Sequence, residues 1–195
     1  MSQRIIGLTG GIGSGKSIVS DYLATKYDVP ILDADDYAKE AVSTDSPILE
    51  KIKQRYGNQI LHSDGTLNRS RLGEIIFNQP TEKKWLEQQI HPDVRQKIET
   101  ALSQLEASCV VVVIPLLFEA KMTDLVTETW VVYCSPQQQL ERVMKRDQLS
   151  EKDARSRIDS QLSLEEKVAL ADVVIDNSGT VNELYQQVDQ AKINR

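Results

Sequence analysis

Five short apolar segments, rich in β-branched residues, divide the chain and are separated by helical patterns. The apolar segments cover residues 4–9, 30–33, 109–116, 130–134 and 172–176. Within the third segment, residues 110–114 read Val-Val-Val-Val-Ile without polar alternation, which is typical of a strand covered on both faces. Apolar residues at helical spacing follow Lys16 and recur in residues 47–56, 80–89, 93–106, 136–146, 151–161 and 181–193. The pattern predicts an α/β protein, with a five-stranded parallel sheet and helices on both of its faces.

The spacing of the predicted strands is uneven and indicates how the chain is divided. About 75 residues separate the second strand from the third, whereas a crossover between parallel strands needs only one helix. Residues 35–107 are therefore expected to form a helical insert. Residues 141–165 are polar and charged, which suits a small, mobile helical element, the lid segment. The remaining residues, 1–34, 108–140 and 166–195, are assigned to the core.

Local signals predict where the helices of the insert begin. Asp35 or Asp36 is expected to cap a helix that starts just after the second strand, because aspartate is a favoured N-cap. Pro92 interrupts a long helical stretch and is expected to begin a new helix, since proline is favoured in the first turn. Residues 57–66 resemble a long loop.

The charge balance narrows the possible partners. The 195 residues include 23 Lys and Arg against 29 Asp and Glu, a formal net charge of −6. Such a chain, without a long basic run, is a poor candidate for binding nucleic acid or an anionic membrane surface. Its apolar runs are far shorter than the ~20 residues of a membrane span, and glycines interrupt the apolar start, unlike a signal peptide. Cys109 and Cys134 lie in apolar segments, so we expect buried free thiols and a cytoplasmic protein.

The strongest motif lies between the first strand and the helix that follows it. Residues 10–17 read Gly-Gly-Ile-Gly-Ser-Gly-Lys-Ser and fit the phosphate-binding pattern G-x-x-x-x-G-K-[ST] of P-loop NTPases. Glycines let successive backbone N–H groups converge on phosphate oxygens, and the helix N-terminus adds partial positive charge. Lys16 is expected to reach the β- and γ-phosphates of ATP, and Ser17 to ligate Mg²⁺. The predicted nucleotide contacts are Gly11, Ile12, Gly13, Ser14, Gly15, Lys16 and Ser17.

Among the classes that carry this loop, the sequence favours a small kinase. The Asn-Lys-x-Asp motif that GTPases use for guanine is absent. Motor and transport ATPases usually place an acidic residue at the end of a hydrophobic strand, but here Pro115 follows that strand, and the chain is short for those classes. Asp33 ends the second strand, where strand ends line the ligand crevice, and can accept or orient the proton of an attacking hydroxyl. A helix N-cap is the alternative role for Asp33.

Arginines are concentrated in the lid segment. Between residues 142 and 157, six Lys and Arg stand against three Asp and Glu, so the local charge is 6 − 3 = +3 in a chain of −6. A solvated helix face is the usual meaning of such charges. In a chain with a phosphate loop, however, they favour a lid that closes over the transferred phosphate through Arg142 and through Arg146 or Arg157.

Two further positions carry candidate chemistry. Asn177 belongs to an Asp-Asn-Ser-Gly sequence after the last strand, which is well placed to contact a nucleotide base. A helix-capping turn is the alternative. Arg95 lies four residues after His91 and can point to a substrate phosphate, although a lone His and Arg are more often structural.

Taken in order, these motifs resemble the dephospho-coenzyme A kinase family over nearly the whole chain. The resemblance is carried by residues 7–17 (GLTGGIGSGKS), 33–35 (DAD), His91-Pro92 with Arg95, 115–119 (PLLFE), Arg142 with Arg146-Asp147, Arg157 with Gln161, and 171–179 (ADVVIDNSG). It implies that ATP phosphorylates the ribose 3′-hydroxyl of dephospho-CoA, the last step of CoA synthesis. It also implies a P-loop core, a helical acceptor domain and a lid. It also implies that four residues bind the acceptor substrate: Asp33, His91, Arg95 and Arg157.

The resemblance leaves some points open. Ile114 stands where an acidic residue is sometimes seen, so Mg²⁺ is expected to be held by Ser17, ATP oxygens and water, with Asp33 joining through a water. A different small-molecule or nucleoside monophosphate kinase is one alternative, and a non-enzymatic ATP-binding regulator is another. The long insert favours a long acceptor, and Asp33 with the lid arginines favours an enzyme. The expected partners are small molecules only, and the chain is expected to be a monomer or a weak homo-oligomer.

Overall fold

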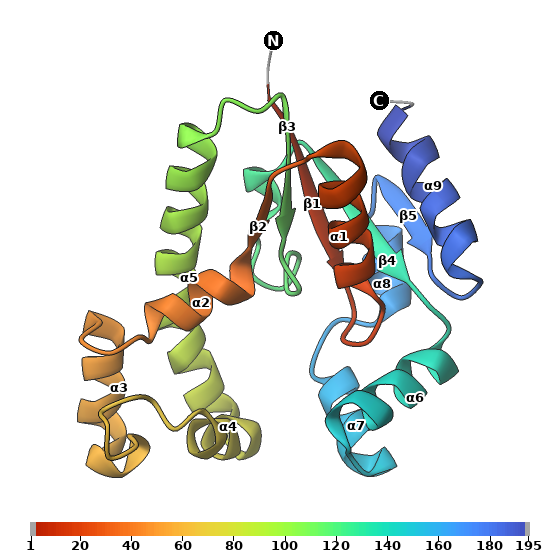
Figure 1. Ribbon diagram of the computed structural model, residues 1–195. Helices are drawn as coiled ribbons and strands as arrows, with labels where there is room; N and C mark the ends of the chain where they lie inside the picture. The colour runs from red at the N-terminus through yellow and green to blue at the C-terminus, as the bar shows by residue number, and fades with distance from the viewer. Residues whose placement is uncertain (1–2, 194–195) are drawn as a thin grey trace. The chain divides into compact units, whose positions relative to one another are not determined.

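The computed structural model describes residues 3–193 (Figure 1). The chain forms two compact units. The first contains Met1–Asp33 and Gln104–Arg195, and the second contains Ala34–Ser103. Each unit has its own cluster of buried apolar side chains. The roles of acceptor domain, for residues 35–107, and of lid, for residues 141–165, remain predictions.

A five-stranded parallel sheet organises the first unit, as the sequence predicts. The strands are β1 (Arg4–Gly10), β2 (Ile31–Asp33), β3 (Cys109–Val113), β4 (Glu128–Tyr133) and β5 (Val173–Asp176). They lie in the order β2-β3-β1-β4-β5 and all pairs are parallel. All five residues of β3 are buried, as its unbroken apolar run indicates. The predicted end of this strand at residue 116 is wrong, because Pro115 has no N–H with which to continue the ladder.

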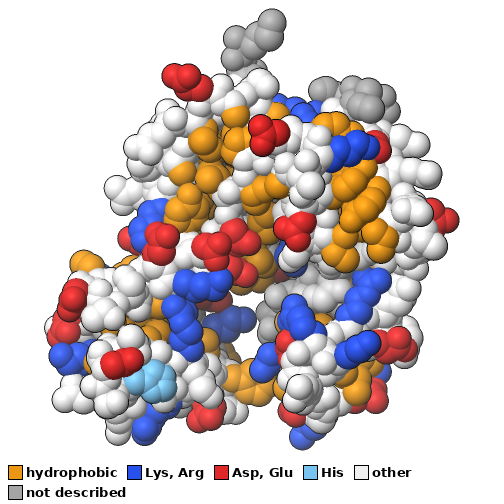
Figure 2. Space-filling view, viewed as in Figure 1, with side chains coloured by type: hydrophobic (Ala, Val, Ile, Leu, Met, Phe, Trp, Pro, Cys, Tyr) orange, Lys and Arg blue, Asp and Glu red, His pale blue; other side chains and the backbone are white. Residues whose placement is uncertain are grey.

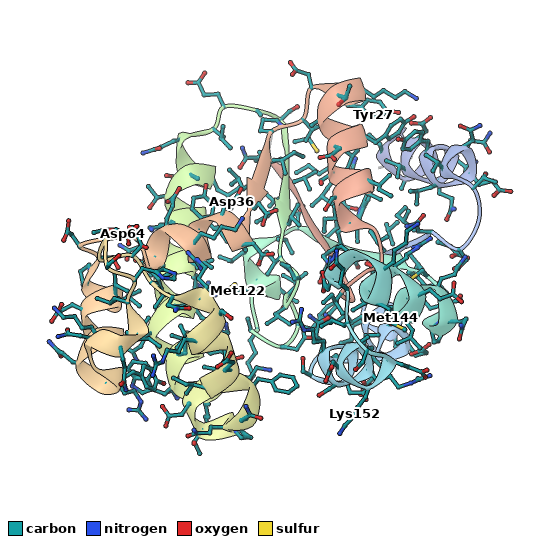
Figure 3. The ribbon with its side chains drawn as sticks, turned by 60° about the horizontal axis from the view of Figure 1, so that its bottom comes forward. Tyr27, Asp36, Asp64, Met122, Met144 and Lys152 are labelled. Atoms are coloured by element: carbon teal, nitrogen blue, oxygen red, sulfur yellow. The ribbon has the colours of Figure 1, made fainter. Side chains whose placement is uncertain are left out.

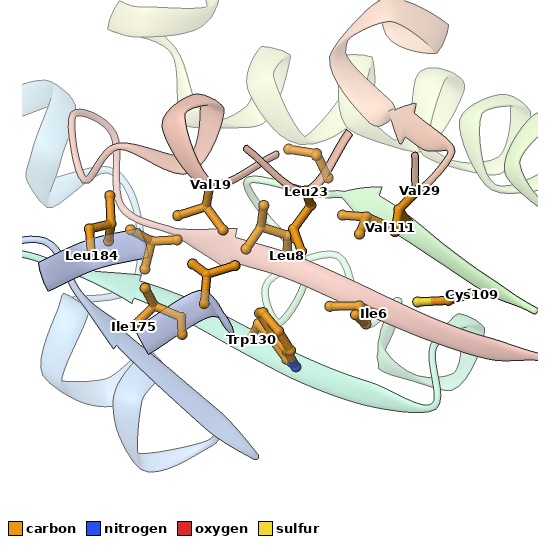
Figure 4. Close-up of a cluster of buried hydrophobic side chains, with 13 residues drawn as sticks. Ile6, Leu8, Val19, Leu23, Val29, Cys109, Val111, Trp130, Ile175 and Leu184 are labelled. Carbon is orange, nitrogen blue, oxygen red and sulfur yellow. The ribbon is translucent and has the colours of Figure 1, made fainter. Parts of the chain in front are cut away.

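Helices cover both faces of the sheet. Helices α1 (Lys16–Tyr27) and α9 (Val181–Ile193) pack on one face, and α8 (Leu164–Ala169) packs against β4 from the other (Figure 1). The main buried cluster fills the space between the sheet and the first two helices, with Leu8, Leu23 and Trp130 fully buried (Figure 4). At the end of α1, the Tyr27 hydroxyl donates to Asp189 of α9 at 2.8 Å, which joins the two helices (Figure 3).

Most of the lid segment is a helix pair within the first unit. Its helices are α6 (Pro136–Asp147) and α7 (Glu151–Asp159). Ser135 begins α6 with a capping box, and Ser150 caps α7. The two helices share a small buried cluster that contains Val143 and Ala154. Lys152 extends from α7 away from the pair (Figure 3). The pair therefore has an apolar contact of its own and a charged outer surface.

The second unit is helical. Its elements are α2 (Ala34–Ala41), α3 (Pro47–Tyr56), the 3₁₀ turn η1 (Asn58–Ile60), α4 (Arg69–Asn78) and α5 (Pro80–Gln104). Ile52 and Ile60 are fully buried at the centre of its apolar cluster. Helix α4 was not predicted, although Asn68 marks its start by accepting a hydrogen bond from the backbone N–H of Arg71 at 3.0 Å. The turn η1 was not predicted either, and it lies in the expected loop.

Helix α5 continues through Pro92, so the predicted start of a new helix there is wrong. Proline in a helix interior removes one hydrogen bond and normally breaks or kinks the helix. The buried face of α5 explains the difference. Leu86, Val94 and Ile98 are spaced by eight and four residues, so they form one apolar stripe that extends across the proline. Packing on both sides of Pro92 therefore favours a single helix.

Helix α2 begins two or three residues earlier than its expected caps, Asp35 or Asp36, allow. It starts at Ala34, directly after β2, so Asp35 and Asp36 lie inside its first turn and the prediction that one of them caps it is wrong. Carboxylates in a first turn are stabilised by the partial positive charge of the helix N-terminus. Asp33 is the last residue of β2 and immediately precedes the helix.

Glu82 of α5 is tied to α3 by charge-assisted hydrogen bonds, which gives a pH-dependent prediction. Arg55 donates to its carboxylate at 2.6 and 2.9 Å, and the Tyr56 hydroxyl donates at 2.6 Å. These donors, Arg55 first, lower the pKa of Glu82 to about 2. A carboxyl group with a lowered pKa stabilises the folded state above its unfolded pKa of ~4.3, and this contribution disappears as pH falls through the folded pKa.

We expect Glu82→Gln to lower the thermal midpoint of the second unit at pH 7, and the difference from wild type to vanish as pH falls from about 4.3 to about 2. Thermal unfolding followed by circular dichroism at several pH values measures this. Glu50→Gln is the control, because Glu50 is exposed and makes only 3.5 Å contacts with Lys53 and Gln54. A Glu82→Gln difference that is equally large at pH 2 and pH 7 would contradict the prediction.

Candidate functional site

The carboxyl ends of the strands lie along one edge of the sheet and bring predicted site residues together there. Val113 of β3 pairs with Leu8 of β1 on one side and with Asp33 of β2 on the other. Asp33 is therefore level with Leu8 across two strand spacings, which is about 10 Å at the usual ~4.8 Å per strand. On the other side of β1, the backbone N–H of Asn177 donates to the carbonyl of Tyr133 at 2.7 Å.

The phosphate loop, residues 10–17, connects β1 to α1 along this edge. Gly13 and Gly15 have φ of 76° and 103°, values that favour glycine. A Cβ at Gly15 would overlap the side-chain amide of Asn177, and a Cβ at Gly13 would come within 2.8 Å of Val143. Helix α1 begins right after Gly15, with no acidic residue in its first turn and no side-chain cap. Its N-terminal N–H groups and partial positive charge can therefore serve an anion.

Lys16 and Ser17 are placed at the start of α1 as the motif predicts. The Lys16 ammonium donates to the carbonyl oxygens of Gly10 and Gly11, both at 2.9 Å, so the positive charge lies on the loop itself. Ser17 is exposed in the first turn of α1. A phosphate group in the loop would thus meet the Lys16 ammonium and the exposed Ser17 hydroxyl, which belong to consecutive residues.

Side chains from other elements hold the phosphate loop in shape. Gln139 of α6 donates to the carbonyl of Ile12 at 2.9 Å, and the backbone N–H of Ile12 donates to Gln161 at 3.0 Å. The side-chain amide of Asn177 donates to the carbonyl of Ser14 at 2.7 Å and is buried. Asn177 therefore supports the loop backbone directly. Neither glutamine was among the predicted site residues.

Arg142 of α6 lies beside the phosphate loop. Its Nη2 donates to the carbonyl of Asn177 at 2.9 Å, and its Nη1 donates to the carbonyl of Ser14 at 3.4 Å. The Ser14 carbonyl thus accepts from both Asn177 and Arg142. The structure brings this predicted catalytic arginine next to the loop that it is expected to serve.

Arg146 and Arg157 have a different neighbour. Both donate to Asp147, Arg146 at 2.7 Å and Arg157 at 3.2 Å. Arg146, with a smaller effect from Arg157, lowers the pKa of Asp147, so its carboxylate offsets part of the positive charge of the lid segment. Lys and Arg side chains gather on the surface over α6 and α7 (Figure 2). Contacts of Arg146 and Arg157 with a phosphate remain a prediction.

His91 and Arg95 belong to the second unit. They lie four residues apart in α5, which places them on one face of the helix. Both side chains are partly exposed, and Arg95 donates to Glu99 at 2.9 Å. The common face agrees with a joint role in binding, and the role itself remains a prediction.

Sequence reasoning missed Lys167, a fully buried lysine in α8. Its ammonium donates to the carbonyl of Pro115 at 2.9 Å and lies 2.9 Å from Oε1 of Glu119. Lys167 follows Leu164 by three residues, so it falls on the buried face of α8. Charged residues are normally read as exposed, and the sequence contains no other signal for this one.

Residues 3–193 contain neither a membrane-spanning helix nor a cluster of metal ligands. No helix there combines the length and the hydropathy needed to cross a membrane. The same residues contain no group of three or more His, Cys, Asp or Glu that could hold a metal ion. Cys134 is also a poor candidate for a nucleophile, because burial raises the pKa of its thiol.

Comparison of the sequence with known proteins finds one family over most of the chain. The family model for dephospho-CoA kinase matches residues 4–183. The dephospho-CoA kinase of Trichormus variabilis is 56% identical over 191 residues, which is 98% of this chain and 97% of that protein. The dephospho-CoA kinase of Synechocystis is 58% identical over 190 residues, which is 97% of this chain and 94% of that protein.

Solved structures give the same result for the fold. A Thermus thermophilus protein has a TM-score of 0.85 and 34% identity, and the match covers 100% of this chain and 98% of that one. Dephospho-CoA kinase from Campylobacter jejuni has a TM-score of 0.71 and 30% identity, covering 98% of this chain and 96% of that one. Shikimate kinase from Acinetobacter baumannii, at 18% identity and a TM-score of 0.58 with 99% and 94% coverage, shares the fold.

Proposed function

The chain belongs to the dephospho-CoA kinase family and phosphorylates dephospho-CoA with ATP in the final step of CoA biosynthesis, and from this premise we propose how its residues carry out the transfer. The γ-phosphoryl group of ATP passes in line to the ribose 3′-hydroxyl, without a covalent enzyme intermediate. The observation that carries this proposal is the shared sheet edge, which holds the phosphate loop with Lys16 on it and Asp33 level with β1.

ATP binds with its phosphates in the phosphate loop. Backbone N–H groups of residues 11–17 and the N-terminus of α1 receive the phosphate oxygens, and the Lys16 ammonium neutralises charge on the β- and γ-phosphates. Lys16 already lies on the loop through Gly10 and Gly11, so little rearrangement is needed. Asn177 and Arg142 keep the backbone at Ser14 in place. Contact of residues 176–179 with the base is part of this proposal.

Mg²⁺ fits this site through a single protein side chain. The exposed Ser17 hydroxyl follows the loop directly, and hydroxyl and phosphate oxygens are ligands that Mg²⁺ accepts together with water. We assign Ser17 and ATP oxygens to the ion, with Asp33 joining through a water. When bound, the ion neutralises charge on the β- and γ-phosphate oxygens.

Asp33 accepts or orients the proton of the attacking 3′-hydroxyl. The backbone fixes its position from both sides, because β2 ends at Asp33 and α2 begins at Ala34. A carboxylate held in this way can keep the hydroxyl aligned with the γ-phosphorus and take its proton as the bond to phosphorus forms.

The lid segment supplies positive charge over the transferred phosphoryl group. Arg142 is the best placed of the lid arginines for this role, since it already contacts the loop backbone at Ser14. Arg146 and Arg157 reach the phosphate only by giving up Asp147. Closure of the segment excludes water, which would otherwise compete as an acceptor and hydrolyse ATP.

His91 and Arg95 bind dephospho-CoA, and this assignment gives a kinetic prediction. A charge-assisted hydrogen bond is worth about 1.5–3 kcal/mol, which corresponds to about a 10- to 100-fold change in affinity. We expect Arg95→Ala to raise KM for dephospho-CoA by about that factor and to leave KM for ATP within about twofold, and His91→Ala to act in the same direction. Steady-state kinetics with each substrate varied in turn measure this.

Arg71→Ala is the matched control for Arg95→Ala. Arg71 is an exposed arginine of α4 in the same unit, so its loss should leave both KM values unchanged. A larger rise in KM for ATP than for dephospho-CoA in the Arg95 variant would refute the assignment.

The acceptor itself is tested by a panel assayed with Mg-ATP. Dephospho-CoA, AMP and adenosine are compared as acceptors by ADP formation and by identification of the product. We expect CoA as the product and turnover of dephospho-CoA far above that of the two shorter acceptors. Preference for AMP would indicate a nucleoside monophosphate kinase, and ATP binding without turnover would indicate a regulator.

We also propose that the enzyme acts in the cytoplasm, as a monomer or a weak homo-oligomer with small-molecule partners only. Cys109 and Cys134 support a reducing compartment, because both are buried free thiols. The net charge of −6 gives no support to nucleic-acid binding.

A further inference from the structure

Lys167 carries a buried positive charge outside the residues assigned to ATP or to the acceptor. None of its side chain is exposed. Removing an ammonium group from water is costly unless it is paired and hydrogen bonded. Here it donates to the Pro115 carbonyl and pairs with Glu119, both at 2.9 Å. An apolar side chain could fill the same position of α8 without this cost. The buried charge of Lys167 therefore indicates a specific role.

Glu119 extends this contact to the end of the lid segment. The Oε1 atom that pairs with Lys167 also accepts the backbone N–H of Leu162 at 3.0 Å. The preceding residue, Gln161, accepts the backbone N–H of Ile12 in the phosphate loop at 3.0 Å. Two adjacent residues of the chain that returns from α7 are thus held at two points, one on Glu119 and one on the loop.

The Pro115 carbonyl links the same pair to the strand that enters the phosphate loop. It accepts a hydrogen bond from the hydroxyl of Thr9 at 3.2 Å, in addition to the bond from Lys167. Thr9 is fully buried and immediately precedes Gly10. Lys167 therefore connects, through one ammonium group, the entry of the loop and the segment that rests on it.

We propose that Lys167 and Glu119 are positioning residues for phosphoryl transfer. By fixing Leu162 they keep Gln161 on Ile12, and so hold the end of the lid segment and the phosphate loop in one geometry. They act through Gln161 and Pro115 and do not touch the reacting groups. This inference rests on the proposed role of the phosphate loop in ATP binding.

Replacing both charges together separates positioning from stability. Exchange of a buried ion pair for apolar residues of similar volume is often neutral or stabilising, whereas removal of one partner is strongly destabilising. We expect the paired variant Lys167→Met/Glu119→Leu to unfold near the wild-type temperature and yet to lose about 10- to 100-fold in kcat/KM for ATP, because small misplacements of a site have effects of this size. Wild-type kinetics in the folded paired variant would overturn the proposal.

A double-mutant cycle shows whether the pair acts through Gln161. Gln161→Ala alone should lower kcat/KM for ATP, and adding it to the paired variant should cause little further loss, because the contact with Ile12 is already released. If Gln161→Ala lowers kcat/KM by the same factor in the paired variant as in the wild type, the pair does not act through Gln161. If the paired variant fails to fold, Lys167→Met/Glu119→Met, which also removes both charges and the acceptor for the N–H of Leu162, is measured in the same cycle with the same expectation.

Glu128→Gln is the matched control for loss of a buried charge. Glu128 pairs with Arg4 at the opposite edge of the sheet and accepts from Trp130 at 3.1 Å. We expect this variant to be less stable but to keep wild-type kinetic constants, measured well below its unfolding temperature. If Glu128→Gln lowers kcat/KM as much as the paired variant does, the kinetic loss comes from general destabilisation and the proposal is overturned. Absence of kinase activity in the wild type would refute the proposed function itself, whereas an active wild type with an unaffected paired variant refutes only this inference.

Discussion

Lys16→Met is expected to lower kcat/KM for ATP by about 10²- to 10³-fold, because it removes the side-chain cation that the structure places on the carbonyls of Gly10 and Gly11 in the phosphate loop. Loss of one preorganised donor to developing charge costs typically 10² to 10³ in rate, or about 3–4 kcal/mol of transition-state stabilisation. Methionine keeps the length of the side chain, so the change is chiefly one of charge.

Two measurements make the Lys16 result specific. Lys192→Met is the control. Lys192 lies in the last turn of α9, at the opposite edge of the sheet, where its backbone carbonyl accepts a hydrogen bond from Arg4. Its ammonium group has no role in the proposed site. Thermal unfolding shows whether loss of the bonds to Gly10 and Gly11 has loosened the loop. A well-folded Lys16→Met enzyme with kinetic constants within a few-fold of wild type would contradict the placement of ATP in this loop.

Asp33→Asn is expected to lower kcat by about 10²- to 10⁴-fold, the usual contribution of a positioned general base. The amide keeps the shape of the side chain but cannot take the proton of the 3′-hydroxyl. Turnover by the wild type should fall at acidic pH as the carboxylate is protonated, and the variant should lack this dependence. Measurement of kcat against pH for both enzymes tests the prediction.

Asp36→Asn is the control for the Asp33 variant. Asp36 is a nearby carboxylate, but it is exposed in α2 and pairs with Lys39 at 2.7 Å. Its replacement should leave kcat and its pH dependence unchanged. Nearly full turnover of Asp33→Asn with the wild-type pH profile would show that Asp33 is not the base.

The sheet and the phosphate loop could be predicted because their signals are local. Unbroken apolar runs such as β3 identify buried strands, and the loop needs glycines where φ is positive, as at Gly13 and Gly15. Asp33 could be placed because carboxyl ends of parallel strands share one edge. The helix through Pro92 could not, since tertiary packing of Leu86, Val94 and Ile98 overrides the local preference of proline.

The other features that could not be predicted are specific contacts between side chains and their partners, some of them far apart in the sequence. Gln161 meets Ile12 across 149 residues, and Lys167 meets Pro115 across 52. Residue type does not reveal these partners, because a lysine or glutamine in a polar segment is usually solvated. The pairing of Arg146 and Arg157 with Asp147 was missed for the same reason: the sequence shows that charges cluster, but not which of them meet.

We propose that one phosphoryl group passes directly from ATP in the phosphate loop to dephospho-CoA. The stereochemical course at phosphorus tests it most directly. ATP made chiral at the γ-phosphorus with sulfur and oxygen isotopes is used as the donor, and the configuration of the thiophosphorylated product is determined. A single in-line transfer inverts the configuration, and inversion is the predicted result. Retention would require two transfers through a phosphorylated enzyme and would contradict the account.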